Sequence, residues 1–534
     1  LYQFYISEKK DEVIGKVVKS EDIPAATQLF TPNWIVKYLV QNTIGRQWLA
    51  TYPDSSLRQH MEYYIEPAEQ TEDVNAQLAA ITPKTLDPEQ LTLLDPACGS
   101  GHILVEAYDL FKAIYQERGF RSKDIPRLIL EKNLFGLEID DRAAQLAALA
   151  LLMKARADDR RIITDHIQPN VLAIQESKEL DELLQGEPWE ESLLDENSLF
   201  PEMLKQPSLK QRQESRLDSI EPCLRELIKL FEHGKSFGSL IQLPPELVAR
   251  LPEARQSIEA LMAEPHLWKQ RAATLLLPLM SQAVLLSNTY SVVVANPPYL
   301  GSKHMNPEIK QFASRNFPDG KADLFGMFAL RLLPLVHLNH HLGLMTPFTW
   351  MFITSYEDLR QTLVNQNTLW SLIQPEYHAF FDSAYVPICT FVIQKADLDI
   401  NGTFIDLSQF YGEELQPLKT LEAIRSPACD WRFCVGSHEF SKLPGSPIAY
   451  KIASAIRDAF VNYPPLSTFA DARKGMVTGE NSTYVRQWHE VSWNRIGFGV
   501  TSREQGVQSQ KRWFPYAKGG EFRKWFGNLD AVVN

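Results

Sequence analysis

The chain has 534 residues, of which 44% are hydrophobic, so it is long enough for two or three domains with sizeable cores. Its formal net charge of −12, taken alone, argues against a partner as acidic as nucleic acid. The longest apolar stretch, 272–287, is broken by Pro278 and by polar residues. It therefore predicts a buried core helix and argues against a membrane span.

Short apolar runs bounded by turn residues alternate with helical periodicity through the middle of the chain. This alternation predicts an α/β fold, with a doubly wound, mostly parallel, Rossmann-like sheet of seven strands. The helix after the first strand is expected from about Ile103 to Arg118, and a second Ala- and Leu-rich helix from Asp141 to Ala155. The seven strands are expected to begin near residues 91, 133, 161, 290, 341, 369 and 388.

The first predicted strand ends in the glycine loop DPACGSG, and a helix follows directly. A strand, a glycine turn and a helix start let a nucleotide-like ligand approach the backbone at the carboxyl edge of a sheet. Only two glycines occur and the G-x-G-x-x-G pattern is missing, which disfavours a pyrophosphate cofactor. Packing alone could also require such a turn. The candidate cofactor-binding residues of this loop are Asp95, Pro96, Ala97, Gly99 and Gly101.

Glu138 ends the second predicted strand, about 40 residues after the loop. An acidic side chain at this place can accept hydrogen bonds from both hydroxyls of a ribose. A solvated strand-end acid is the alternative for a lone glutamate. Together with the glycine loop, ribose binding is favoured.

About 125 residues separate the third and fourth predicted strands, far more than the roughly 2 to 6 expected for a connection inside an α/β unit. Residues 172–260 hold 18 Asp and Glu against 10 Lys and Arg. The Leu- and Glu-rich blocks of this region read as amphipathic helices with polar outer faces. We therefore expect an acidic helical insertion over 172–285, whose function the sequence does not assign.

The fourth predicted strand, SVVVA, leads directly into Asn296, Pro297, Pro298 and Tyr299. The Asn296 side chain offers an amide oxygen, and Pro298 restrains the preceding residue so that the Pro297 carbonyl is fixed beside it. Two such acceptors can hold both hydrogens of an exocyclic amino group such as adenine N6. Tyr299 offers a flat face for a base rotated out of its duplex. A tight turn with a packed Tyr is the bland alternative, disfavoured by the combination of four residues after a buried strand.

The C-terminal part of the chain differs in charge from the rest. Residues 473–534 hold 10 Lys and Arg against 5 acidic residues, with ten aromatic residues interleaved. This mixture suits contact with phosphates and bases. A solvated basic surface around a small aromatic core is an equally good interpretation of composition alone.

These motifs, in this order, resemble the γ-type, adenine-specific DNA N6-methyltransferases that depend on S-adenosylmethionine. The resemblance extends over residues 28–395. It implies that Phe30, Thr31 and Pro32 of QLFTPNWIVKYLV lie over the methionine part of the cofactor, and that Asn296 also contacts the cofactor. NPPY is the family's catalytic tetrapeptide, so the reaction would be methyl transfer to adenine N6 after base flipping, without a metal.

Two later segments add to the resemblance. KADLFGMFALRLLP implies that Asp323 and Phe325 lie near the pocket. FFDSAYVPICTFVIQK implies that Phe381, with Phe380 as the alternative, forms the other wall of the base pocket together with Tyr299.

LYQFYISEKKDEV, GMVTGENSTYVRQW and PYAKGGEFRKWFGNLDAVVN are similar to the PglX methyltransferase family of BREX phage-defence systems. That family is longer at both ends, so we interpret the chain as a piece of a longer protein. The resemblance implies duplex DNA, other BREX-system proteins and phage-encoded inhibitors as partners. The expected organisation is an N-terminal helical segment, 1–90; a cofactor-binding half, 91–171; the insertion, 172–285; a catalytic half, 286–400; a connecting region, 401–460; and the start of a target-recognition domain, 461–534.

Other functions are weaker alternatives. Asn-Pro-Pro-Tyr also occurs in enzymes that methylate RNA bases or protein glutamine, and a non-catalytic DNA-binding scaffold could retain this fold. Cys98 lies in the cofactor loop, so the thiolate route to cytosine methylation lacks its nucleophile. The five scattered cysteines show no zinc spacing and fit a reducing cytoplasm, and the HLNHH run lacks nearby carboxylates or cysteines.

Overall fold

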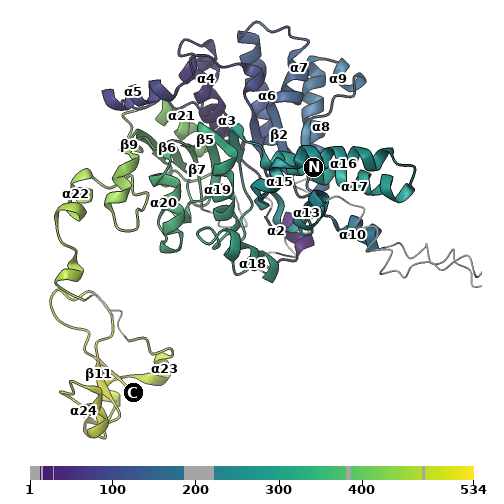
Figure 1. Cartoon of the computed structure of the whole chain (residues 1–534). Helices are drawn as coiled ribbons and strands as arrows, with labels where there is room; N and C mark the ends of the chain where they lie inside the picture. Colours follow the sequence, from purple (N-terminus) through teal and green to yellow (C-terminus); the bar gives the residue numbers. More distant parts are fainter. Residues whose placement is uncertain (1–12, 14–15, 28, 186–221, 380–386, 472–475) are drawn as a thin grey trace, which may run out of the picture. The chain divides into compact units, whose positions relative to one another are not determined.

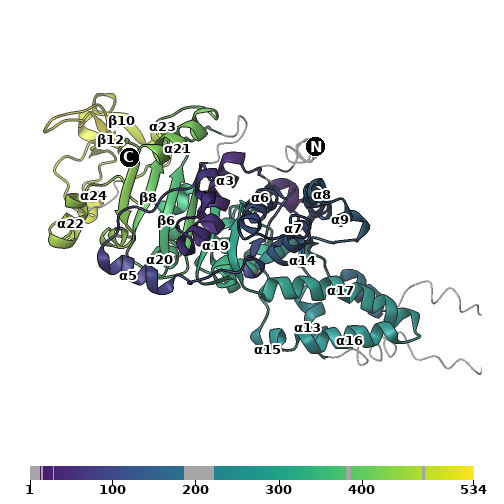
Figure 2. The same cartoon turned by 90° about the horizontal axis from the view of Figure 1, so that it is seen from above.

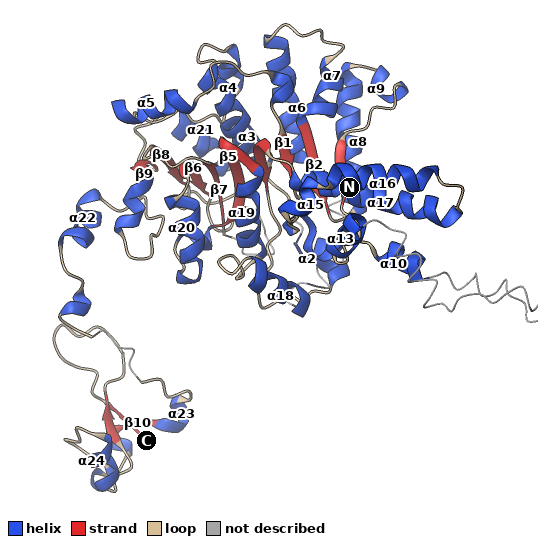
Figure 3. Ribbon diagram, viewed as in Figure 1, coloured by secondary structure: helices blue, strands red, loops and turns tan. Residues whose placement is uncertain are grey.

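The computed structural model forms two compact units, Leu1–Asn462 and Tyr463–Asn534. The first unit is a mixed α/β fold in which one sheet lies between helices (Figure 1; Figure 3). Within the part that the structure describes, no helix is long and apolar enough to cross a membrane. The described residues are 13, 16–27, 29–185, 222–379, 387–471 and 476–534.

The sheet of the first unit has nine strands in the order β3-β2-β1-β4-β5-β7-β6-β8-β9. The five strands from β3 to β5 are parallel, β7 runs antiparallel between β5 and β6, β8 is parallel to β6, and β9 is antiparallel to β8. The strands are β1 Leu93–Asp95, β2 Leu134–Glu138, β3 Asn170–Ala173, β4 Tyr290–Ala295, β5 Val336–Pro347, β6 Thr368–Gln374, β7 Ile388–Gln394, β8 Asn401–Asp406 and β9 Arg432–Gly436.

The mostly parallel sheet is as expected, but the expected number of seven strands is wrong. The two additional strands, β8 and β9, come from the region 401–460 that was expected only to connect two domains. β8 is buried along nearly its whole length, yet its sequence NGTFID mixes polar residues and a glycine with only two apolar residues. The apolar run that identifies a buried strand is therefore missing from its sequence.

The strand predicted near residue 161 is also wrong, because Arg161–Thr164 is the short helix α9. Asp159 accepts a hydrogen bond from the Arg161 backbone N–H, which starts a helical turn. Only Ile162 of the two isoleucines is buried, whereas Ile163 is 50% exposed. The third strand lies further on, at Asn170–Ala173, and is a half-buried edge strand.

Alternate side chains of β4 enter two separate cores, because successive residues of a strand point to opposite faces of the sheet. Val293 and Ala295 belong to one core, and Val292 and Val294 to the other. A sheet covered on both faces has continuous apolar strands, as SVVVA illustrates. The longer helices of the first unit are α3 Asn33–Val40, α5 Glu72–Ile81, α6 His102–Glu117, α8 Asp141–Asp158, α10 Lys178–Gln185, α13 Pro222–Leu230, α16 Leu251–Ala263, α17 Leu267–Ser287, α18 Pro307–Asn316, α19 Leu324–Leu335, α20 Glu357–Asn365, α21 Leu415–Arg425 and α22 Ser454–Asn462.

The helices α13, α16 and α17 come from the region 172–285 and pack in the same core as α19 and α20. α16 and α17 lie side by side in both views (Figure 1; Figure 2). Leu276, Leu279 and Ala283 of α17 are buried, so the predicted core helix is confirmed. Its Gln282 side chain exchanges two hydrogen bonds with the backbone of Gln175, at 2.8 and 3.0 Å, which fastens the helix behind β3.

The second unit contains a three-stranded antiparallel sheet in the order β10-β12-β11. Many of its aromatic side chains are exposed, including Phe522, Trp525 and Phe526, each at least 82% exposed. Its elements are α23 Asn481–Tyr484, β10 Val485–Gln487, α24 Arg503–Gln508, β11 Phe514–Tyr516 and β12 Ala531–Val533.

Candidate functional site

The glycine loop connects the end of β1 to the start of α6. Its Cys98 N–H donates to the Leu137 carbonyl of β2, which holds the loop against the neighbouring strand. Gly101 caps α6 with φ of +86°, and a Cβ there would lie 2.9 Å from the Cβ of Ala147 in α8. Both the backbone conformation and the close approach of α8 therefore require glycine at this position.

Glu138 at the end of β2 organises the loop through its carboxylate. One oxygen, Oε2, accepts the Gly99 N–H at 2.8 Å, and Oε1 accepts the N–H groups of Ile139 and Asp140 at 2.9 and 3.1 Å. A carboxylate has about four acceptor positions, so Oε2 retains one for a further donor such as a ribose hydroxyl. Burial raises the pKa of Glu138, although the three backbone hydrogen bonds oppose this.

Asp95, the last residue of β1, is only 1% exposed. Its Oδ1 accepts the Ala97 N–H at 3.2 Å. Burial raises the pKa of Asp95 to about 8, and the negative charge of Glu138 adds to the effect. The carboxyl is therefore kept neutral near pH 7 unless a cation, such as the ammonium group of an amino acid, approaches it.

Asp95 makes the stability of the protein depend on pH. Because its pKa in the folded state is raised from 3.8 to about 8, the folded protein holds a proton between about pH 4 and pH 8 that the unfolded chain releases. The contribution of Asp95 to the free energy of unfolding is therefore fully present at low pH and is lost as the pH rises through this window. We expect Asp95→Asn to raise the melting temperature relative to the wild type more at pH 9 than at pH 5. A difference that is independent of pH, measured by calorimetry, would contradict this assignment.

Asn296 follows β4 at the carboxyl edge of the sheet, and its side-chain amide has a defined orientation. Its Nδ2 donates to the Leu29 carbonyl at 3.0 Å, and its Oδ1 accepts the Tyr299 hydroxyl at 2.8 Å. A carbonyl can only accept, so the amide nitrogen must face Leu29 and the oxygen must face the opposite way. Among the described residues, none donates to the backbone carbonyl of Pro297. Asn296 Oδ1 and this carbonyl are thus two acceptors with spare capacity.

Tyr299 is half-buried and anchors the same turn. Its hydroxyl has one hydrogen but two carbonyl acceptors, Asn296 Oδ1 at 2.8 Å and Met345 O at 3.1 Å. The hydrogen can move to Met345 when another donor approaches Asn296. Its ring meets Phe325 edge-on, with centroids 6.3 Å apart.

Asp323 holds the chain that follows Tyr299. Its Oδ1 accepts the Leu300 N–H at 2.8 Å and the Phe325 N–H at 3.4 Å, so it also caps α19. Gly301 forms an antiparallel bridge with Asp323. The tetrapeptide is therefore fastened on one side by Leu29 and on the other by Asp323.

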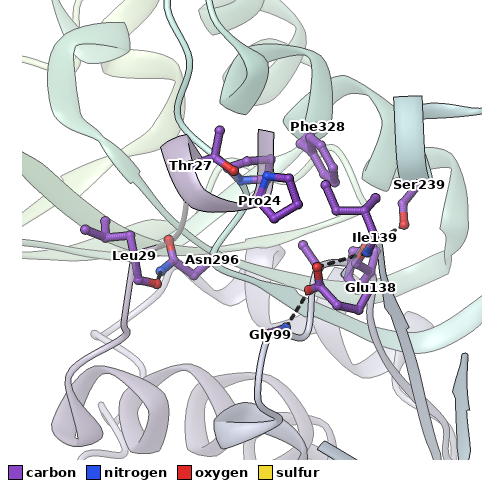
Figure 4. Close-up of a pocket in the computed structure, with 12 residues that line it drawn as sticks. Pro24, Thr27, Leu29, Gly99, Glu138, Ile139, Ser239, Asn296 and Phe328 are labelled. Carbon is purple, nitrogen blue, oxygen red and sulfur yellow. Dashed lines mark hydrogen bonds between the residues drawn. The ribbon is translucent and has the colours of Figure 1, made fainter. Parts of the chain in front are cut away.

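Two hollows at the carboxyl edge of the sheet share Leu29, Ala97, Gly99 and Asn296. Figure 4 shows the hollow that is also lined by Glu138 and Ser239. The structure brings nine of the predicted site residues to their walls: Phe30, Thr31, Asp95, Pro96, Ala97, Gly99, Glu138, Asn296 and Pro298. Four others do not line these hollows: Pro32 precedes α3, Gly101 caps α6, and Pro297 and Tyr299 belong to the turn after β4. Phe380 and Phe381 lie outside the described residues.

Several residues that line the hollows were not predicted from the sequence. Phe328 lines the hollow, whereas the predicted Phe325 is buried behind it. Phe328 is three residues further along α19, so the helical period could have indicated it. Ile139 directly follows the predicted Glu138, so its position could have indicated it. Ser239 comes from the insertion, and no motif in the sequence indicates that it lies at the hollow. Pro24 and Thr27 of α2, Ile23–Thr27, also contribute to the wall.

This donor and acceptor set fits a nucleoside-type ligand. A carboxylate with spare capacity faces the hollow at Glu138, and a neutral buried acid lies at Asp95. In the described part of the chain, no three His, Cys, Asp or Glu side chains are grouped so that they could hold a metal ion. The fold and the hollows together define an α/β protein with a candidate ligand site at the topological switch point, between β1 and β4.

Comparisons with known proteins identify relatives of this chain. The family model of the Eco57I restriction-modification methylase matches residues 132–381, and that of the MmeI DNA-methyltransferase domain matches residues 68–191. The adenine-specific methyltransferase BrxX of Escherichia coli O9:H4 (strain HS) is 45% identical over 541 residues. The adenine-specific methyltransferase PglX of Lacticaseibacillus casei (strain Zhang) is 33% identical over 564 residues.

This chain is therefore related to the adenine-specific methyltransferases BrxX and PglX. Both alignments include 100% of this chain, but the chain spans only 43% of the length of each relative. Among solved structures, the type IIL restriction-modification enzyme MmeI in complex with DNA has a TM-score of 0.37 and 14% identity, over 72% of this chain and 39% of that one.

Proposed function

We propose that this chain transfers a methyl group from S-adenosylmethionine to N6 of adenine in duplex DNA, as part of a BREX-type phage-defence system. The observation that carries this proposal is the defined orientation of the Asn296 amide beside the Pro297 carbonyl. The two acceptors lie at the end of β4, and Asn296 lines both hollows that begin at the glycine loop. An exocyclic amino group has two hydrogens to give to such a pair.

The residues of this chain would act by position and electrostatics. Asn296 Oδ1 and Pro297 O accept hydrogen bonds from the two N6 hydrogens. These two hydrogen bonds hold the nitrogen nearer to tetrahedral geometry and make its lone pair available. S-adenosylmethionine, when bound, supplies an electrophilic methyl group on a positively charged sulfur. The N–C bond forms as the C–S bond breaks, and the methylated nitrogen then loses one proton to solvent. The Tyr299 hydroxyl can turn to Met345 and free Asn296 Oδ1 for the substrate.

The remaining site residues would hold the cofactor. Glu138 suits the ribose hydroxyls, and Asp95 suits the ammonium group of the methionine part. Phe30 and Thr31 lie on the same hollow as Asp95, and Pro32 directs the chain into α3. The sheet order supports this assignment, because open α/β sheets bind ligands at the topological switch point, which lies here between β1 and β4.

Duplex DNA is the proposed substrate, and the target base would leave the helix to reach Asn296. Tyr299 and Phe381, or Phe380, would stack on the flipped base. The second unit supports contact with nucleic acid, since the exposed Phe522, Trp525 and Phe526 alternate with Arg523 and Lys524. The related BrxX and PglX also make other BREX proteins and phage-encoded inhibitors candidate partners.

A radiolabelled methyl-transfer assay tests the proposal. We expect label from S-adenosylmethionine in an adenine-containing duplex and in no duplex whose adenines are already N6-methylated. RNA and a total protein extract are assayed in parallel as the alternative substrates. Label only in RNA or in protein glutamine would overturn the choice of substrate, and purified protein that binds no cofactor would indicate a scaffold.

A further inference from the structure

The acidic insertion reaches the cofactor hollow through a short segment, 234–241, which contains α14 Gly234–Phe237 and the 3-10 turn Gly238–Leu240. Ser239 lines the same hollow as Glu138 and Asn296 and is otherwise buried. Its hydroxyl donates to the Pro96 carbonyl of the glycine loop at 2.5 Å. The insertion thus contacts the glycine loop directly.

Three further contacts fix the segment over the end of β2. Lys235 Nζ donates to the Ile139 carbonyl and to Asp141 Oδ1, both at 2.8 Å. Arg331 of α19 donates to the Ile241 carbonyl at 3.0 and 3.2 Å. The segment is therefore anchored both to the chain that follows β2 and to α19.

Gly238 allows the segment to approach the hollow closely. Its φ is +53°, and a Cβ there would lie 2.8 Å from Cγ2 of Ile139. Any other residue would push the segment away from Ile139 or strain the backbone. The close approach of the insertion to the end of β2 therefore depends on this one glycine.

Ser239 lies at a particular end of the hollow. Figure 4 shows Asn296 and Leu29 on one side of Glu138 and Ser239 on the other. With the ribose on Glu138 and the methyl group at Asn296, the purine ring of the cofactor falls on the Ser239 side. This placement rests on the proposed function.

We propose that the segment 234–241 forms the purine end of the cofactor site and that Ser239 selects a 6-aminopurine. The hydroxyl hydrogen of Ser239 is committed to Pro96, so toward the hollow the oxygen can only accept a hydrogen bond. An amino group on the purine can donate to it, whereas a 6-oxo group would place two acceptors against each other. The insertion is thereby a part of the cofactor site.

Calorimetric titration with S-adenosylhomocysteine and S-inosylhomocysteine tests this selection, since the two ligands differ at the purine 6-position. We expect Ser239→Ala to weaken S-adenosylhomocysteine about tenfold while S-inosylhomocysteine changes little, so that the preference shrinks. Ser257→Ala is the matched control, because Ser257 also donates to a carbonyl, that of Glu253, within the insertion but does not line the hollow. It should leave both affinities unchanged.

Gly238→Ala provides a second test, because a displaced wall should weaken both ligands by about tenfold or more. Thermal unfolding checks that each variant is folded. If Gly238→Ala does not fold, the comparison of the two ligands in Ser239→Ala still tests the inference. Wild-type affinities in both variants, or an equal loss for both ligands in Ser239→Ala, would overturn the inference. A wild-type protein that binds neither ligand would instead overturn the proposed function itself.

Discussion

Replacing Asn296 with alanine is expected to reduce methyl transfer by roughly a hundredfold or more, because one of the two acceptors for the amino hydrogens is removed. Cofactor affinity should change little, because the Glu138 carboxylate and its hydrogen bonds to the glycine loop, which would hold the cofactor, remain in this variant. Single-turnover methylation and calorimetric titration of the cofactor separate the two effects. Tyr299→Phe is the matched control: it keeps the ring and removes only the hydroxyl that contacts Asn296 Oδ1.

The Tyr299→Phe variant should retain more activity than Asn296→Ala, because Asn296 Oδ1 remains available. If Asn296→Ala lost cofactor binding in proportion to its activity, Asn296 would belong to the cofactor site alone. The proposed grip on the amino group would then be wrong.

Glu138→Ala is expected to weaken cofactor binding by roughly a hundredfold, because a site built to pair with hydroxyl groups loses its acceptor. The variant also releases the Gly99, Ile139 and Asp140 N–H groups, so the glycine loop loses its support. Glu138→Gln keeps one acceptor oxygen and the same size, and should fall between the wild type and Glu138→Ala. Titration with S-adenosylhomocysteine measures all three proteins.

An affinity of Glu138→Ala within a few-fold of the wild type would show that the ribose lies elsewhere. Thermal unfolding is the accompanying control, since lost loop support also lowers stability. The comparison with Glu138→Gln separates support of the loop from contact with the ligand.

The parts of the fold that were predictable are those with strong local patterns. β4 and the turn after it could be located because SVVVA is continuously apolar and Pro297 and Pro298 cannot continue a ladder. α9 was mistaken for a strand because four residues, RIIT, carry too little periodicity to separate a helical turn from a strand. β8 was missed because its burial comes from neighbouring strands and not from its own composition.

The residues of the candidate site also include some that could be predicted from the sequence and some that could not. Residues near the glycine loop and the tetrapeptide could be predicted because their backbone and side-chain chemistry is carried by short motifs. The Asn296–Leu29 hydrogen bond joins residues 267 positions apart, and Ser239 meets Pro96 across 143 positions. Contacts of this kind depend on how the chain returns to the sheet edge, which no local pattern records.

The grip of Asn296 and Pro297 on the adenine amino group can be seen in a structure of the protein bound to an unreactive cofactor analogue and to duplex DNA containing its target adenine. We expect N6 to lie about 3 Å from both Asn296 Oδ1 and the Pro297 carbonyl oxygen, with the sulfur side of the analogue facing N6. An adenine whose amino group contacts neither oxygen, or an analogue bound away from Glu138, would contradict it.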